Sequence, residues 1–377
     1  MNILHICNDF AGSKVHGNLT RELDDLGVIQ TVYCPVREER LLGKNQFDGK
    51  HIRFVYSFCI RSWYKFVYHY KAFKLYKDMK AKVNLGEVDF IHAHTLFSDG
   101  VLAYKAHKEY GVKYAVAIRN TDLNDYIRLM KHTYSTGRKI LLNAEKVYFI
   151  SAGIKRQFEE SKFVRPKLDQ VKDKFVLQPN GIDDYWHGHI SHEERTGHDV
   201  LYVGDFSANK NVVRLAEAVL ELRKEKGFED VRLFIVGGEV KGGARKNDGK
   251  TQAMIDANPD AIKALGKIYD KDKLAEVMRS CSMFAMTSIF ETFGLVYVEA
   301  LSQNLPVVFT KGQGIDGMFD KSVGIAVDPL DVGETKEAIK TILTHHEQYG
   351  NMTVNFEEFE WKRIARNYKQ EYINNSK

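Results

Sequence analysis

The sequence predicts an α/β protein made of two doubly wound, Rossmann-like domains. First, short runs rich in β-branched and aromatic residues alternate with amphipathic segments of helical periodicity. Second, this alternation occurs as two successive series along the chain. Third, the 377 residues exceed what one ordinary hydrophobic core holds. Because alternating strands and helices form a parallel sheet covered on both faces, two series predict two such sheets.

The first series predicts a parallel sheet within residues 1–180. Its candidate buried strands are 1–7, 28–35, 88–94, 113–118 and 146–151. Amphipathic helical stretches, such as 16–26 and 99–110, separate several of these strands. The opening run reaches Asp9 with no basic segment before it, so we interpret it as a buried strand and not as a signal peptide.

The second series follows a polar, histidine-rich stretch at 178–199, where we place the join. Its candidate strands are 199–204, 231–238, 283–288 and 304–310, separated by helical segments at 211–226, 272–281, 294–303 and 333–344. The last segment is an amphipathic helix whose apolar face carries Trp361, Ile364, Ala365, Tyr368 and Tyr372. We therefore expect domains over 1–180 and 181–358, and a C-terminal helix over 359–377 that packs back on the first domain.

Composition is that of a globular protein, with 44% hydrophobic and 28% charged residues. No run of about 18 apolar residues occurs, so the sequence predicts no membrane-spanning helix. The four cysteines are scattered without a CxxC pair, at Cys7, Cys34, Cys59 and Cys281. This pattern indicates reduced thiols in a cytoplasmic protein, without a zinc site or a disulfide framework.

Charge is unevenly distributed along the chain. Residues 1–180 carry a net charge of +11 and residues 181–377 a net charge of −6, so the first half is expected to face something anionic. Segment 60–82 holds seven Lys or Arg residues, one Asp and seven aromatic residues. Such basic amphipathic segments lie on anionic membrane surfaces. The alternative is a helix that covers the sheet with a solvated basic face. No motif supports nucleic-acid binding.

The most informative stretch is 288–308, which combines two acids, a glycine and an aromatic residue before a helical run. A helix N-terminus suits phosphate, and carboxylates suit hydroxyl groups, so together they predict a nucleotide-sugar site. Eight helical residues turn by about 800°, which leaves about 80° between Glu291 and Glu299. We therefore place Glu291 in the loop and Glu299 on the helix.

These residues resemble a known family over nearly the whole chain. The run Glu291–Thr292–Phe293–Gly294–Leu295 through Glu299–Ala300, followed by Pro306–Val307–Val308, is similar to the E-x7-E signature of retaining glycosyltransferases of family 4, which have the GT-B fold. Other motifs in matching order are Tyr202–Val203–Gly204 with Asn209–Lys210–Asn211, Pro179–Asn180–Gly181–Ile182–Asp183, Ile91–His92–Ala93–His94 and Arg119–Asn120–Thr121–Asp122.

The resemblance implies roles for individual residues. Glu299 would bind the donor ribose, Glu291 would contact sugar hydroxyls, and Lys210 would neutralise the diphosphate leaving group. Backbone N–H groups would reach the donor around Thr292, Phe293, Gly294 and Leu295, and the donor would also lie near Gly12, Gly204, Asp205 and Gly238.

Two positions depart from the family pattern. Asp205 stands where the family often has an arginine, and Arg214 is a candidate substitute for the missing cation. Arg119 stands where the family often has a histidine near the reacting sugar. Arg119 would do a similar electrostatic job there, or Asp122 would hold it. A strand-end salt bridge between Arg119 and Asp122 is the structural alternative. His16, in the glycine-bearing loop after the first strand, is a further acceptor-side candidate.

The resemblance implies a metal-independent hexosyltransferase that needs no cofactor. Its donor would be a nucleotide diphosphate sugar, and its acceptor a hydroxyl of a glycan or polyprenyl-linked glycan in surface polysaccharide synthesis. The site would lie in a cleft between the domains, in a cytoplasmic protein with a peripheral contact at the inner membrane face.

A nucleotide-sugar epimerase of the same fold and a non-catalytic glycosyltransferase-like subunit both stay open as alternatives. A dinucleotide-dependent dehydrogenase is disfavoured, because neither series has a G-x-G-x-x-G motif after its first strand.

Overall fold

The computed structural model describes residues 1–238 and 249–376. The chain divides into two compact units. Unit 1 comprises 1–150, 154–181 and 358–377, and unit 2 comprises 151–153 and 182–357. Each unit is described by itself below.

Unit 1 is built on a seven-stranded parallel sheet in the order β3-β2-β1-β4-β5-β6-β7. The strands are β1 (Asn2–Ile6), β2 (Ile29–Val36), β3 (Ile52–Phe58), β4 (Phe90–Ala93), β5 (Lys113–Ile118), β6 (Lys146–Phe149) and β7 (Phe175–Leu177). The chain runs outward from β1 through β2 to β3 and then returns to place β4 on the other side of β1. This reversal of strand order is where doubly wound sheets bind ligands, at the carboxyl ends of the strands.

The helices of unit 1 connect these strands. They are α1 (Lys14–Asp25), α2 (Tyr68–Lys82), α3 (Gly100–Tyr110), α4 (Tyr134–Asn143), α5 (Ala152–Glu160) and α6 (Leu168–Val171), with a π-helical segment at Asp122–Ile127. The inner strands are largely buried, and all four residues of β4 are buried. Burial on both faces explains why their sequences are continuous apolar runs.

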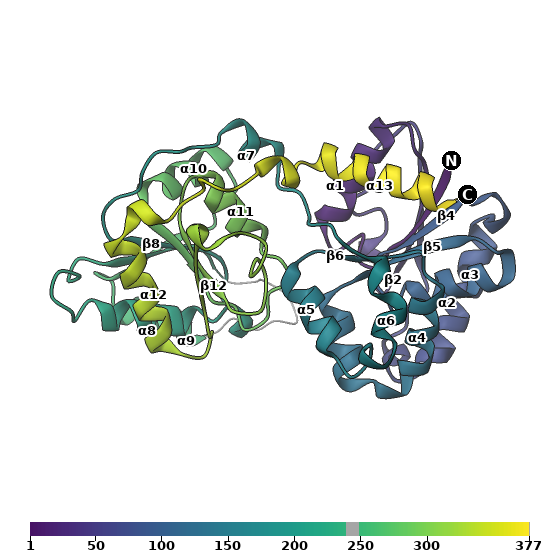
Figure 1. Ribbon diagram of the computed structural model, residues 1–377, viewed down its shortest axis with the longest axis horizontal. Helices are drawn as coiled ribbons and strands as arrows, with labels where there is room; N and C mark the ends of the chain where they lie inside the picture. Colours follow the sequence, from purple (N-terminus) through teal and green to yellow (C-terminus); the bar gives the residue numbers. More distant parts are fainter. Residues whose placement is uncertain (239–248, 377) are drawn as a thin grey trace. The chain divides into compact units, whose positions relative to one another are not determined.

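The C-terminal helix α13 (Trp361–Ser376) completes the core of unit 1. It packs beside α1, and Figure 1 shows the two helices together. Its five predicted apolar residues are all buried, in one cluster with residues of β1, β4, β5 and β6. The tyrosine at position 372 also hydrogen-bonds through its hydroxyl to His92 Nδ1, at 2.6 Å.

Unit 2 has a six-stranded parallel sheet in the order β10-β9-β8-β11-β12-β13. Its strands are β8 (Asp199–Asp205), β9 (Arg232–Gly238), β10 (Ile262–Gly266), β11 (Met283–Met286), β12 (Val307–Thr310) and β13 (Gly324–Val327). Its helices are α7 (Asp184–Gly188), α8 (Val212–Leu222), α9 (Gly249–Ala257), α10 (Lys271–Ser280), α11 (Leu295–Ser302) and α12 (Val332–Thr344). The strand order reverses between β8 and β11.

The fold class predicted from the sequence is confirmed by these two parallel sheets. Four strands were missed, and they are the four edge strands, β3, β7, β10 and β13. Edge strands are partly exposed, as the burial of β3 and β10 shows, so they lack the continuous apolar run that marks an inner strand. No helix in the described ranges is long and apolar enough to cross a membrane.

Candidate functional site

The candidate donor residues of unit 2 gather where its strand order reverses. Lys210 ends a short helical turn after β8, and Glu291 lies in the loop between β11 and α11. The amino group of Lys210 contacts the Glu291 carboxylate at 2.9 Å. The two side chains are only 20% and 12% exposed, so the pair lies beyond the carboxyl ends of β8 and β11 with little solvent around it.

Amide side chains fix the loop that carries Glu291. Asn209 bonds to Phe290 in both directions, donating to its carbonyl at 2.9 Å and accepting from its N–H at 3.1 Å. Gln313 donates to the Ile289 carbonyl at 2.8 Å and accepts from the Glu291 N–H at 2.8 Å. Because an amide both donates and accepts, each of these residues satisfies two loop backbone groups at once. Asn209 belongs to a motif singled out in the sequence, but the sequence carries no sign of the bonds that either residue makes.

Asn211 joins three segments at the start of α8. It adopts the left-handed conformation, with φ of 58°, which asparagine tolerates better than most residues. Its amide donates to the carbonyls of Thr287 at 3.0 Å and Pro329 at 2.6 Å. Arg214, the candidate substitute cation, donates to the Asn211 side-chain oxygen at 2.8 Å. Arg214 thus supports the turn that carries Lys210.

Helix α11 begins directly after the loop of Glu291. Gly294 has φ of 80°, and a Cβ there would lie 2.5 Å from the Tyr297 ring. Only glycine fits such a position without strain. Phe293 is buried, and the Tyr297 hydroxyl donates to the Met286 carbonyl, which ties the helix start to the end of β11. The first N–H groups of a helix have no partner within it, so this start suits an anion.

Glu299 lies on α11, as predicted, while Glu291 lies outside the helix. Burial, and next the Asp183 carboxylate, raise the pKa of the Glu299 carboxyl to about 7. Lys271 and a hydrogen bond with Trp186 act in the opposite direction. Lys271 is itself paired with Asp183 at 2.5 Å. Asp183 belongs to a motif singled out in the sequence, whereas the sequence carries no sign of the roles of Lys271 and Trp186 beside Glu299.

The ends of β8 and β9 lie side by side, with Asp205 opposite Gly238. The Asp205 carboxylate accepts the Ser207 N–H at 2.8 Å, and the Tyr202 hydroxyl donates to the Asp205 carbonyl at 2.7 Å. Gly204 leaves no room for a side chain, because a Cβ would lie 2.4 Å from the Tyr202 hydroxyl. Asp205 thus caps the turn that leads to Lys210.

The acceptor-side candidates lie in unit 1, at the carboxyl ends of β1, β4 and β5. The Asp122 carboxylate accepts the N–H groups of Leu96, Phe97 and Arg119 at 3.2, 3.0 and 2.9 Å. Burial raises the pKa of Asp122 to about 6 in spite of these bonds. The Arg119 guanidinium donates through Nε to the His94 carbonyl at 3.3 Å. Asp122 therefore holds the backbone of Arg119, so the alternative of a strand-end salt bridge does not describe this contact.

His16 follows the Gly12 turn and is buried in the first turn of α1. The Gly12 N–H donates to the Asp9 carbonyl at 2.9 Å. The His16 ring meets the His94 ring edge-on, with centroids 4.8 Å apart. Burial lowers the pKa of His16 to about 3, helped by the charge of Arg119 and by His5. His16 is therefore neutral at physiological pH.

Two groups of side chains in the described residues have donor atoms close enough to share a metal: His5 with His92 and His94, and Cys7 with His16 and His94. In the first group, His92 and His94 stack at 4.2 Å with planes 13° apart. Imidazole lone pairs lie in the ring planes, so nearly parallel rings do not converge on one ion. In the second group, burial raises the pKa of Cys7, which disfavours the thiolate a metal requires. Neither arrangement favours a metal.

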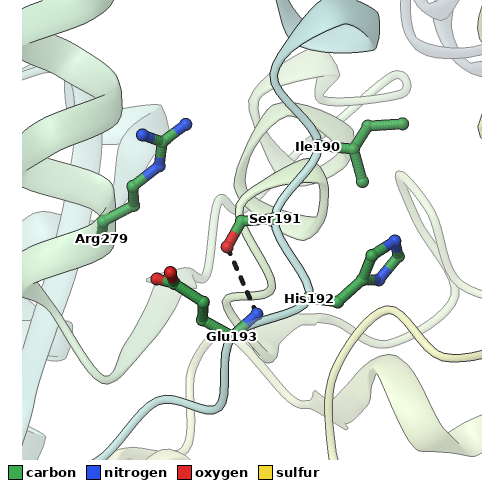
Figure 2. Close-up of a pocket in the computed structure, with 5 residues that line it drawn as sticks. All are labelled: Ile190, Ser191, His192, Glu193 and Arg279. Carbon is green, nitrogen blue, oxygen red and sulfur yellow. Dashed lines mark hydrogen bonds between the residues drawn. The ribbon is translucent and has the colours of Figure 1, made fainter.

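A pocket of about 340 Å³ lies elsewhere in unit 2 and is shown in Figure 2. It is lined by Ile190, Ser191, His192, Glu193 and Arg279. The Ser191 hydroxyl accepts the Glu193 N–H at 3.3 Å, and Arg279 donates to the Gln303 side chain at 2.8 Å. None of its lining residues belongs to the predicted site, so we assign these contacts to holding the segment before β8.

Comparison with known proteins covers both halves of the chain. Residues 13–185 match the model of Glycosyltransferase Family 4, and residues 189–358 match the model of Glycosyl transferases group 1. An uncharacterised glycosyltransferase of Methanocaldococcus jannaschii is 23% identical over 307 residues, which cover 79% of this chain and 78% of the relative. The putative teichuronic acid biosynthesis glycosyltransferase TuaC of Bacillus subtilis is 24% identical, over 88% of this chain and 85% of TuaC.

Solved structures agree with this at the level of the fold. The sucrose-phosphate synthase of Thermosynechococcus elongatus aligns over 99% of this chain and 98% of its own, with a TM-score of 0.71 and 17% identity.

Proposed function

Because this chain is a family 4 glycosyltransferase with the GT-B fold, we propose that it is a retaining hexosyltransferase. The family implies a nucleotide-sugar donor and an acceptor. In our proposal the donor is a nucleotide diphosphate hexose, and the acceptor is a hydroxyl of a glycan or lipid-linked glycan. The observation that carries the proposal is the 2.9 Å pair of Lys210 and Glu291 beside the start of α11.

The donor would be bound from its two ends. The Glu299 carboxylate would accept the ribose hydroxyls, since an ionised carboxylate accepts several well-directed hydrogen bonds. Glu291, fixed by Gln313, would accept hydroxyls of the sugar. The diphosphate would then lie between these acids, near Lys210 and the N–H groups around Gly294.

Lys210 and the start of α11 would supply the positive charge that the reaction needs. Breaking the anomeric C–O bond leaves an oxocarbenium-like sugar and a diphosphate with new negative charge. Fixed positive groups aimed at that charge lower the barrier, and removing one such group typically costs 100- to 1,000-fold in rate. Because Glu291 already holds Lys210, the lysine needs little reorganisation when the diphosphate leaves.

We assign acceptor deprotonation to the leaving phosphate, on the same face of the sugar. His16 is a poor alternative base, because its pKa of about 3 makes it a weak proton acceptor at neutral pH. Arg119 would act electrostatically near the acceptor, with its backbone held by Asp122. Attack and departure on one face retain the anomeric configuration. The relative TuaC, named for teichuronic acid biosynthesis, supports a role in surface polysaccharide synthesis.

The decisive experiment begins with a panel of UDP-, GDP- and ADP-hexoses screened by thermal shift, since a ligand that binds the native state raises its stability. The selected donor is then incubated with methyl and octyl hexosides, and the anomeric configuration of the product is read by NMR. Retained configuration supports the proposal. Epimerised donor without transfer identifies an epimerase, and no binding from the whole panel identifies a non-catalytic subunit.

A matched pair of variants tests the role of Glu291. Glu291→Ala should abolish transfer while leaving the affinity for the nucleoside diphosphate within about twofold by calorimetry, because the sugar is the only part of the donor that the carboxylate would contact, and Lys210 keeps its charge without it. Glu193→Ala, in the separate pocket of Figure 2, should leave transfer unchanged. Equal losses of binding and transfer in Glu291→Ala would show that the acid is needed for the fold of the site instead.

Metal independence can be tested directly. Since Lys210 and the start of α11 provide the positive charge, we expect full activity in millimolar EDTA. Loss of activity that Mg²⁺ or Mn²⁺ restores would contradict this expectation.

A further inference from the structure

Helix α2 of unit 1 has one face in the core and an unusual opposite face. Its buried residues recur at helical spacing: Tyr68, Ala72, Leu75 and Met79. The opposite side and the turn before it expose large apolar side chains: Trp63 at 49%, Val67 at 37%, Tyr70 at 43% and Phe73 at 54%. We call these four residues the aromatic face.

Basic residues share this exposed side. At about 100° per residue, Lys74 and Lys77 lie about 40° and 20° from Tyr70 around the helix axis, and Phe73 about 60° from it. Met79 lies about 180° away, in the core. Lys74 and Lys77 are both exposed, as is Arg61 just before the helix. The aromatic face and these three cations therefore point to the same side.

The exposed rings are held in place by one another. Trp63 stacks on Tyr70 with centroids 5.4 Å apart and planes 28° apart. Tyr64, which is buried, meets both rings edge-on at 4.7 and 5.9 Å. The Lys74 amino group lies 5.5 Å from the centre of the Tyr70 ring. A surface of fixed large side chains loses little entropy when it meets a partner.

The positive charge of this surface is not cancelled locally. In the part of the chain that the structure describes, no carboxylate pairs with Arg61, Lys74 or Lys77. The one acid of the segment, Asp78, is bound by Lys82 at 2.9 Å and by a tyrosine hydroxyl at 2.8 Å. The partner is therefore expected to be anionic.

A bilayer surface fits this chemistry better than a nucleic acid does. Trp and Tyr prefer the headgroup level, where one end of the ring is apolar and the other wet, and lysines above them meet anionic lipid heads. A single-stranded nucleic acid needs free ring faces on which its bases stack. Here Trp63 and Lys74 already lie over the Tyr70 ring.

We propose that the aromatic face, with Arg61, Lys74 and Lys77, docks unit 1 on the surface of a bilayer that contains anionic phospholipid. Phe73 and Trp63 enter the headgroup region, and the three cations contact lipid phosphates. This docking needs neither donor nor transfer, so it can be tested independently of the proposed reaction.

The chain contains its own reporter for the test. Of its three tryptophans, Trp186 and Trp361 are 2% and 5% exposed, whereas Trp63 is 49% exposed. Full-length protein is mixed with vesicles of phosphatidylcholine alone or with 30% phosphatidylglycerol, made with or without brominated acyl chains. Quenching by brominated lipid then reports mainly on Trp63. We expect quenching with the anionic vesicles, reduced at 0.5 M NaCl.

Variants separate the apolar contact of the aromatic face from the electrostatic contact of the cations in a vesicle sedimentation assay. Phe73→Ser should weaken binding at least fivefold. Lys74→Gln with Lys77→Gln should weaken binding to anionic vesicles about 25-fold, since each cation near such a surface contributes about fivefold. The matched controls are Tyr269→Ser, Leu330→Ser and Lys226→Gln with Lys321→Gln, exposed residues of unit 2 that should leave binding unchanged.

Several results would overturn the proposal. These are absence of binding to both vesicle types, equal binding to both, or binding that the Phe73 and lysine variants leave intact. Capture by single-stranded RNA together with failure to bind vesicles would identify a nucleic-acid partner instead. Because the substituted side chains are exposed, circular dichroism is expected to show unchanged folding in every variant.

Discussion

Glu299 carries a carboxyl whose pKa is raised to about 7, chiefly by burial and next by the Asp183 carboxylate. Its charge therefore changes within the physiological range, rising from about one tenth ionised at pH 6 to about nine tenths at pH 8. If the ionised form accepts the ribose hydroxyls, nucleotide binding has to follow this titration.

We expect the affinity for the nucleoside diphosphate selected by the panel to rise up to about tenfold from pH 6 to pH 8. In Glu299→Gln the side chain stays uncharged. The affinity of this variant should be weaker than that of wild type at pH 8, and it should lack the rise with pH that ionisation of Glu299 causes. Calorimetry on both proteins at both pH values gives the ratio of the wild-type affinity to the Glu299→Gln affinity. Titration of the nucleotide itself affects both proteins equally and cancels in this ratio. A constant ratio would exclude Glu299 from the ribose site.

His5 shows a second effect of burial. Its pKa is lowered to about 4, chiefly by burial, while an unfolded chain has a histidine pKa near 6.5. The unfolded state therefore takes up a proton first as the pH falls. The stability that neutral His5 contributes is present above pH 6.5 and is lost on going toward pH 4.

We compare wild type with His5→Asn by urea unfolding at pH 7 and pH 5. The substitution costs stability at pH 7, because it disturbs a buried contact of 3.1 Å with His94. The stability gap should shrink by about 2 kcal/mol at pH 5, since the variant has no histidine to protonate there. Ile3→Val, a core change without a titrating group, should keep a constant gap. A constant gap for His5→Asn would show that folding does not shift the pKa of His5.

At the scale of elements, the start of α11 depends on one glycine. Gly294 combines φ of 80° with a Cβ position 2.5 Å from a tyrosine ring. Gly266 has φ of 70° but no atom within 4 Å of its Cβ position. The two positions thus separate backbone strain from steric overlap.

We expect Gly266→Ala to cost about 1 kcal/mol of stability, and Gly294→Ala to cost about 1–3 kcal/mol more. Equilibrium unfolding in urea measures both. Gly294→Ala should also weaken donor binding, because the helix start would shift. Equal costs at the two positions would mean that the Tyr297 ring moves aside freely.

Inner elements were predictable from the sequence, and edge elements were not. The runs around β1, β4, β5, β8 and β11 are apolar on both faces, a pattern that is typical of strands buried inside a parallel sheet. The edge strand β10 has one buried residue among five, so its sequence resembles a loop. Its place in the sheet follows from pairing with β9, a contact that local sequence does not record.

The same distinction applies to the site. Glu291, Glu299 and Lys210 were predicted from motifs in which the residue type itself suits the chemistry, and their roles stay predictions. The amide bonds of Asn209 and Gln313 depend on loops that meet only in the folded chain. Likewise, His5 and His94 are 89 positions apart, so no local pattern indicates their contact.

At the scale of the whole molecule, α13 belongs to unit 1 although unit 2 precedes it in the chain. Its five buried residues lie in the core of unit 1, next to Ile3 and Phe90. Unit 2 is nearly continuous, from 182 to 357 with 151–153 added. Removing α13 therefore exposes the core of one unit only.

We expect deletion of residues 359–377 to destabilise unit 1 and spare unit 2. Hydrogen exchange followed by mass spectrometry should show lost protection in β1 and β4 and retained protection in β8 and β11. Tyr372→Phe, which removes only the hydroxyl bonded to His92, should show a much smaller effect. Unchanged protection in β1 after the deletion would mean that α13 is dispensable for the first core.

The position of α13 also affects how the protein forms on the ribosome. Synthesis delivers residues 1–181 first, but their core stays open until residues 361–376 emerge. Unit 2 is complete earlier, so the half that is made second can finish folding first. During that interval the sheet of unit 1 lacks the helix that covers Ile3 and Phe90. We therefore expect nascent unit 1 to keep this apolar surface open to chaperones until α13 emerges.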